Sequence, residues 1–147
     1  MYKRQSGRRT NDYSYEVSLA AQGFVDEALE RLSQASVDRG GHSGPLILGA
    51  HMLEEEERYE EAVEWYRRAR AAPRLDARRA AIFARNIAEI SAVHLGDPAI
   101  AVADLQALLD TYPTADEVAW ARDELEAIQS GRPSALLARL PVDEEEE

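Results

Sequence analysis

The stretch RYEEAVEWYRRARAA, residues 58–72, decides the fold, because its apolar residues recur with the period of an α-helix. Ala62, Tyr66 and Ala69 are spaced by four and then by three residues, which places them on one stripe of a helix. Charged residues fill seven of the twelve other positions. The stretch therefore predicts a helix with one buried face, and its carboxylates and arginines are expected to be solvated rather than catalytic.

The same stripe recurs twice more in the chain. Segments that start at Gly23 and at Gly96 again follow the four-then-three spacing. The matching residues are Ala28, Leu32 and Ala35 in the first segment and Ala101, Leu105 and Leu108 in the last. The spacing is 34 residues from Ala28 to Ala62 and 39 residues from Ala62 to Ala101. A second helical pattern precedes each segment, so the chain is predicted to consist of repeated helix pairs.

A Leu-Gly pair, the apolar stripe and a closing proline carry a family resemblance. These residues are Leu48, Gly49, Ala62, Tyr66, Ala69 and Pro73 in the middle repeat, and Ala101, Leu105, Leu108 and Pro113 in the last. The pattern resembles the tetratricopeptide repeat (TPR) of bacterial type, a helix-turn-helix unit of about 34 residues. The first Trp of the family pattern is absent, and the third unit is extended. The resemblance implies an all-α fold: a right-handed α-solenoid of about three helix-turn-helix TPR-like repeats plus a C-terminal capping helix.

Local signals place several helix ends and one large side chain. The Asp97–Pro98 dipeptide supplies an N-cap acceptor followed by a proline in the first turn. Thr114 and Glu117 form a capping-box pattern that is expected to open the final helix, which ends near Gln129. Trp65 is expected to be buried against the first helix of the next repeat, with an exposed anchor for a partner as the alternative.

Three regions are expected along the chain. Residues 10–129 form the TPR-like repeat domain. Residues 1–9 are expected to be an artefactual or disordered leader, because MYKRQ is what the end of a transposase adapter used in sequencing libraries would encode. Lys3 is also the only lysine beside sixteen arginines. The alternative is a native basic N-terminus. If the leader is an artefact, the protein is expected to continue upstream. Residues 130–147 are expected to form a short helix and an acidic, disordered tail.

Composition narrows the classes of function. The net charge of −11 argues against nucleic-acid binding, because phosphates would be repelled. The chain has no cysteine, which excludes disulfides and thiolate metal sites. No apolar run approaches the roughly 20 residues that a membrane span needs.

Three features that resemble catalytic or metal sites have simpler interpretations. His51 and Glu55 are four residues apart, but a metal site needs more ligands and no HExxH motif is present. The glutamates of residues 54–57 share one solvated helix end, whereas general acid-base catalysis needs carboxyls in different environments. GGHSGP, from Gly40, lacks the Lys-Ser/Thr of a phosphate loop. The chain is therefore predicted not to be an enzyme and to hold no metal or cofactor.

The family resemblance implies a concave groove, lined by the first helix of each pair, that holds a peptide or a helix of a partner protein. Carrying over the groove positions gives Tyr13 and Val17 in the first repeat, Leu46, Ala50 and Leu53 in the second, and Arg85, Asn86 and Glu89 in the third. Such a groove is largely apolar with one polar end, which suits an amphipathic segment. The lysine/asparagine clamp of the chaperone-tail-binding members is missing.

A second candidate surface is the arginine-rich segment of residues 67–85, which contains seven arginines and one acid. Its docking patch for a carboxylate-rich or phosphorylated partner would consist of Arg67, Arg68, Arg74, Arg78 and Arg79. The simpler interpretation is a solvated turn whose arginines pair with nearby glutamates.

These patterns predict a non-catalytic protein-protein interaction scaffold. The alternative is the repeat region of a larger protein, truncated upstream, with a membrane-anchored or enzymatic part. The compartment stays open between the cytoplasm and the cell envelope, since YPTADEVAWARDELEAI resembles a junction common in bacterial envelope-assembly repeat proteins. An uncapped N-terminal repeat would also allow a homodimer.

Overall fold

The computed structural model describes residues 12–132, and their regular elements are all helical. The α-helices are α2 (Ser14–Ala21), α3 (Val25–Asp38), α4 (Ser43–Glu55), α5 (Tyr59–Arg70), α6 (Ala77–Glu89), α7 (Pro98–Thr111) and α8 (Ala119–Gln129). The predicted all-α class is thus confirmed for this range. The predicted leader, residues 1–9, and the predicted tail beyond residue 132 lie outside the described residues. The contacts divide the chain into two compact units, one up to Pro73 and one from Arg74.

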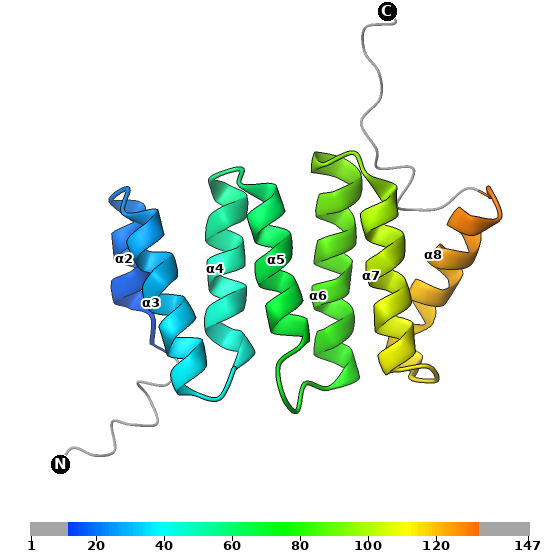
Figure 1. Ribbon diagram of the computed structural model, residues 1–147, viewed down its shortest axis with the longest axis horizontal. Helices are drawn as coiled ribbons and strands as arrows, with labels where there is room; N and C mark the ends of the chain where they lie inside the picture. Colours follow the sequence, from blue (N-terminus) through cyan, green and yellow to red (C-terminus); the bar gives the residue numbers. More distant parts are fainter. Residues whose placement is uncertain (1–11, 133–147) are drawn as a thin grey trace, which may run out of the picture. The chain divides into compact units, whose positions relative to one another are not determined.

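In the first unit, helices α2 to α5 follow one another side by side, and each packs against its neighbour in sequence (Figure 1). The predicted stripes contribute to the core, although Ala35 of the first stripe is only half-buried. Ala28 and Leu32 of α3 are fully buried, as are Ala62 and Ala69 of α5, and Tyr66 is 1% exposed. Periodic burial of this kind is what stabilises helices that are too short to persist alone in water.

Trp65 packs within its own helix pair. Its ring is half-buried and lies on Gly49 of α4, the preceding helix of the same pair. A Cβ atom at Gly49 would stand 2.3 Å from Cζ3 of Trp65. The absence of a side chain at Gly49 therefore lets the indole ring approach the backbone of α4. Burial of Trp65 against the first helix of the next repeat stays a prediction.

The turns inside the first two helix pairs have the same geometry, 34 residues apart in sequence. Gly23 has φ 96° and Glu57 has φ 60°, both in the left-handed region. In each turn the next residue, Phe24 or Arg58, donates its N–H to the carbonyl five residues earlier, at 2.8 Å. This bond closes the C-terminus of the first helix and reverses the chain.

In the second unit, α6 packs against α7 and α7 against α8 (Figure 1). A π-helical turn, Ile90–His94, extends α6, and the Asp97 N–H bonds the carbonyl of Ser91, six residues earlier. The longer closure accompanies the 39-residue spacing of this repeat. The core of the unit includes Ala84 and Ala88 of α6 together with Leu105 and Leu108 of α7 and Ala121 and Leu125 of α8.

The predicted helix starts had different outcomes. The Asp97 carboxylate accepts the N–H of Ala99, and Pro98 opens α7, as predicted. The final helix does end at Gln129, but it begins at Ala119 after a 3-10 turn, Asp116–Val118, and neither start has a side-chain cap. The predicted capping box at Thr114 is therefore not formed.

Candidate interaction surfaces

An apolar cleft of about 230 Å³ lies in the first unit, between α2, the start of α3, and α4. We refer to it as the α2/α4 cleft. It is lined by Val17, Ala20, Ala21, Val25, Leu48, His51, Met52, Glu55 and Glu56. Val17 is 46% exposed. The α2 side of the cleft is formed partly by the small side chains of Ala20 and Ala21. Apolar surface is therefore exposed to solvent between α2 and α4, which are the first helices of two successive pairs.

The polar side of the α2/α4 cleft is acidic. The exposed carboxylates of Glu55 and Glu56 stand at the C-terminal end of α4. Beside them the His51 ring meets the edge of the Tyr66 ring at 6.0 Å between centroids, and the Tyr66 hydroxyl donates to Glu54 at 2.5 Å. Burial raises the pKa of Tyr66 well above its ordinary value, and the hydrogen bond to Glu54 raises it further. Tyr66 is thus a neutral structural donor rather than a base.

A second cleft, of about 300 Å³, lies in the second unit between α6 and the start of α8. We refer to it as the α6/α8 cleft. Its lining residues are Arg78, Ala81, Ile82, Arg85, Glu117 and Trp120. Ile82 is 46% exposed, and the guanidinium carbon of Arg85 lies 4.3 Å from the centroid of the Trp120 ring. Each unit therefore has an open, partly apolar hollow, between α2 and α4 in the first unit and between α6 and α8 in the second.

The residues predicted to line a groove are distributed over very different environments. Val17 lines the α2/α4 cleft and Arg85 the α6/α8 cleft. Tyr13 is half-buried beside α2 and its hydroxyl accepts a hydrogen bond from Arg39. Asn86 and Glu89 are half-buried on α6.

Leu46, Ala50 and Leu53 are 2%, 0% and 0% exposed. These three side chains belong to the core of the first unit and do not face an open groove. Their four-then-three spacing is typical of a buried stripe. The family resemblance had instead assigned these three residues to the groove. The surface of α4 that faces the cleft carries Leu48 and His51 instead.

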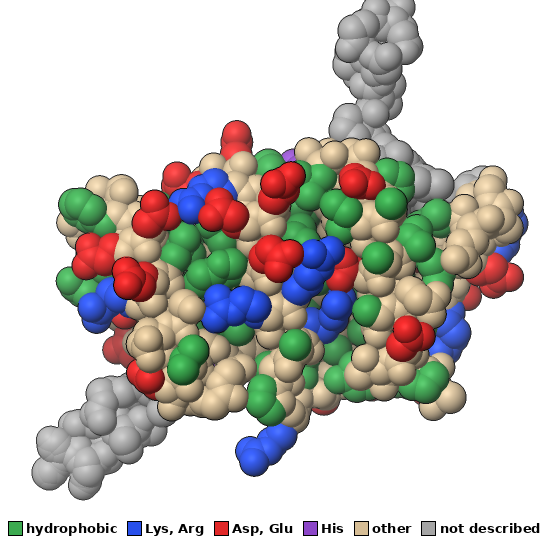
Figure 2. Space-filling view, in the orientation of Figure 1, with side chains coloured by type: hydrophobic (Ala, Val, Ile, Leu, Met, Phe, Trp, Pro, Cys, Tyr) green, Lys and Arg blue, Asp and Glu red, His purple; other side chains and the backbone are tan. Residues whose placement is uncertain are grey.

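The predicted arginine patch divides between the two units. In the first unit Arg67 pairs with Glu64 at 2.8 Å, while Arg68 lies over the Trp65 ring at 5.0 Å and donates to Ser33 at 3.0 Å. In the second unit Arg79 lies 3.7 Å from Asp76, Arg74 is exposed in the turn before α6, and Arg78 lines the α6/α8 cleft. Figure 2 likewise shows acidic and basic side chains interspersed on the face in view. The ion pairs of Arg67 and Arg79 agree with the simpler interpretation.

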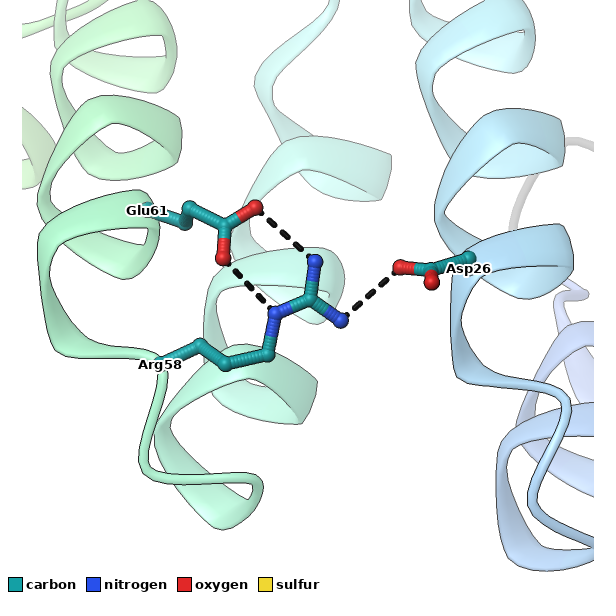
Figure 3. A network of polar contacts seen from close by, with 3 residues as sticks. All are labelled: Asp26, Arg58 and Glu61. Carbon is teal, nitrogen blue, oxygen red and sulfur yellow. Dashed lines mark hydrogen bonds and ion pairs between the residues drawn. The ribbon is translucent and has the colours of Figure 1, made fainter.

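A three-residue ionic network connects α3 with the start of α5 (Figure 3). The Arg58 guanidinium donates twice to Glu61, at 2.7 and 2.8 Å, and once to Asp26, at 2.8 Å. The hydrogen bond from Arg58 lowers the pKa of Glu61. The hydrogen bonds to Glu61 and Asp26 raise the pKa of Arg58. Because all three groups are charged and mutually satisfied, the network is structural.

Among residues 12–132, no three His, Asp or Glu side chains converge as metal ligands. None of the helices described is both long enough and apolar enough to cross a membrane. In comparisons with known proteins, no family model matches the chain and no curated protein shows significant similarity to it.

Proposed function

We propose that this chain is a non-catalytic protein-interaction scaffold of the TPR type, which binds a peptide segment of a partner protein. The observation that carries the proposal is the α2/α4 cleft, an apolar hollow open to solvent between the first helices of two successive pairs. The recurrence of one turn geometry at Gly23 and Glu57 supports the repeat. The right-handed solenoid stays a prediction.

The size of the α2/α4 cleft favours side chains over cofactors. Small-molecule sites usually have volumes of about 300–1,000 Å³ and are mostly enclosed. The α2/α4 cleft has about 230 Å³ and is partly open. A hollow of this kind suits one or two apolar side chains of a peptide, whose backbone stays solvated.

Selection of random peptides displayed on phage, with the full chain as bait, tests this function. Val17→Glu combined with Leu48→Glu places two carboxylates in the α2/α4 cleft, and binding of the selected peptides should fall at least tenfold. Leu46 and Ala50 are unsuitable for this test because both are buried. Val37→Glu controls for an added carboxylate elsewhere in the unit, since Val37 is 61% exposed on α3 and lies outside the cleft; each single cleft variant, Val17→Glu or Leu48→Glu, should weaken binding more than it does.

The variants should keep the helical circular dichroism of the parent chain. Failure to enrich any peptide would contradict the scaffold function. Peptides that bind the cleft variant as well as the parent would place the binding site outside the α2/α4 cleft.

A further inference from the structure

The exposed face of α6 presents two arginines with an apolar residue between them. Arg78, Ile82 and Arg85 are spaced by four and three residues, so they lie on one stripe of the helix. The stripe forms one wall of the α6/α8 cleft, with Trp120 opposite. Ile82 is nearly half exposed although its neighbours Ala81 and Phe83 are buried. Among residues 74–132 of this unit, no side chain covers the exposed half of Ile82.

The two arginines of this stripe keep their charge available. Within residues 12–132 neither Arg78 nor Arg85 forms an ion pair, whereas neighbouring Arg79 lies 3.7 Å from Asp76. The Arg85 guanidinium is positioned over the Trp120 ring, and such stacking leaves the N–H groups at its edge free to donate. Glu117 is the single carboxylate among the described residues that line the cleft, and they include two arginines, so this lining has a surplus of positive charge.

We propose that the α6/α8 cleft binds an acidic peptide segment of a partner protein, with an apolar side chain inserted between Ile82 and Trp120 and flanking carboxylates on Arg78 and Arg85. Charge complementarity carries this assignment: unpaired guanidinium groups bind carboxylates in bidentate geometry. The inference rests on the proposed scaffold function and specifies the chemistry of the partner at this cleft.

The geometry of α6 also sets the spacing of the ligand. Seven residues of helix separate Arg78 from Arg85, which is about 10 Å along the helix axis. A peptide in the polyproline II conformation covers about 9 Å in three residues, and its turn of three residues returns the side chains of the first and fourth positions to the same face. A segment with two glutamates three positions apart and two leucines between them, Glu-Leu-Leu-Glu, therefore matches the stripe.

The experiment is a fluorescence-anisotropy titration of the full chain against the labelled peptide GSELLESG at low ionic strength. The matched peptide GSQLLQSG keeps the shape and removes the charge. We expect the glutamate peptide to bind at least tenfold more tightly than the glutamine peptide. Its affinity should fall at least tenfold in the variant Arg78→Gln with Arg85→Gln, and it should decrease with added salt. Glu117→Gln should strengthen binding, because it removes the opposing carboxylate.

Arg122→Gln with Arg132→Gln is the control variant, because it makes the same change in net charge at exposed positions of the second unit outside the cleft. Equal loss in this control, equal affinity for the two peptides, or no binding of the glutamate peptide would overturn the proposal. If phage-selected peptides still depended on Val17 and Leu48 in any of these cases, the scaffold function would stand and only the acidic ligand would be wrong.

Discussion

At the scale of single residues, the contact between Gly49 and Trp65 is the tightest constraint on sequence in the first unit. We predict that Gly49→Ala destabilises the chain by about 1–3 kcal/mol, the usual cost of overpacking, although alanine favours a helix more than glycine does. The new Cβ would stand 2.3 Å from the indole ring, which must move. Urea unfolding followed by circular dichroism measures the change.

A double-mutant cycle tests whether the indole ring is the cause. In a Trp65→Leu background the same Gly49→Ala substitution should cost much less, because the ring that it would meet is gone. An equal cost in both backgrounds would show that strain in α4 itself, and not the Trp65 contact, requires glycine.

The buried hydroxyl of Tyr66 predicts a dependence of stability on alkaline pH. Because its pKa is raised in the folded state, the unfolded chain releases this proton first, at a pH near 10. The contribution of Tyr66 is fully present below pH 10 and is lost as the pH rises further. Urea midpoints measured from pH 8 to pH 11 should fall more steeply for the parent chain than for Tyr66→Phe.

The exposed Tyr15, which is 57% accessible, provides the control for that slope. Tyr15→Phe should retain the alkaline loss of the parent chain. Tyr66→Phe should also be less stable at pH 8, since it removes the hydrogen bond to Glu54 and leaves that half-buried carboxylate without this donor. A parent slope no steeper than that of Tyr66→Phe would contradict a raised pKa.

At the scale of secondary-structure elements, the two equivalent turns allow a paired prediction. Gly23→Ala should cost about 1 kcal/mol through backbone conformation alone, because an added Cβ meets no atom within 4 Å. Glu57→Gly should stabilise the chain by about 0.5–1 kcal/mol, since glycine adopts a positive φ without the steric cost that glutamate bears. Thermal unfolding of both variants measures whether each substitution raises or lowers the stability of the chain. A destabilised Glu57→Gly would mean that the glutamate side chain supports the turn.

The helices show why some of the arrangement follows from sequence and some does not. In α5 the stripe Ala62, Tyr66, Ala69 predicts buried positions correctly, because most of the other positions are charged, and only the neighbouring Val63 is buried in addition. In α4 apolar residues occur all round the helix, so periodicity cannot separate core positions such as Leu53 from cleft positions such as Leu48. A helical fold, which follows from the spacing of apolar residues, is therefore easier to predict than a binding surface. The surface depends on which of those apolar residues stay exposed to solvent.

The positions of the two clefts could not be predicted from the sequence, for a related reason. Ile82 and Trp120 are 38 positions apart in the chain, and neither belongs to a periodic pattern that marks it as exposed. The arginine-rich composition of residues 67–85 pointed to a basic surface. Composition does not reveal that, within residues 12–132, Arg67 and Arg79 are paired with acids while Arg78 and Arg85 are not.

At the scale of the whole molecule, net charge controls self-association. The chain carries a net charge of −11 at pH 7 and has a pI near 4.8. Repulsion between copies should therefore limit association at neutral pH and vanish near the pI. Static light scattering at constant low salt should show a maximum of apparent mass near pH 4.8.

Salt distinguishes this electrostatic association from an apolar one. Near pH 4.8, added salt should weaken contacts between opposite charges and reduce the scattering. Association at pH 7 that grows with added salt would instead indicate apolar contacts, which repulsion masks at low salt. The first helix pair would then be the surface to change, because Tyr15 and Phe24 are more than half exposed there. Phe24→Glu should abolish that association, whereas Val37→Glu, which adds the same charge at another exposed apolar residue of this pair, should reduce it less.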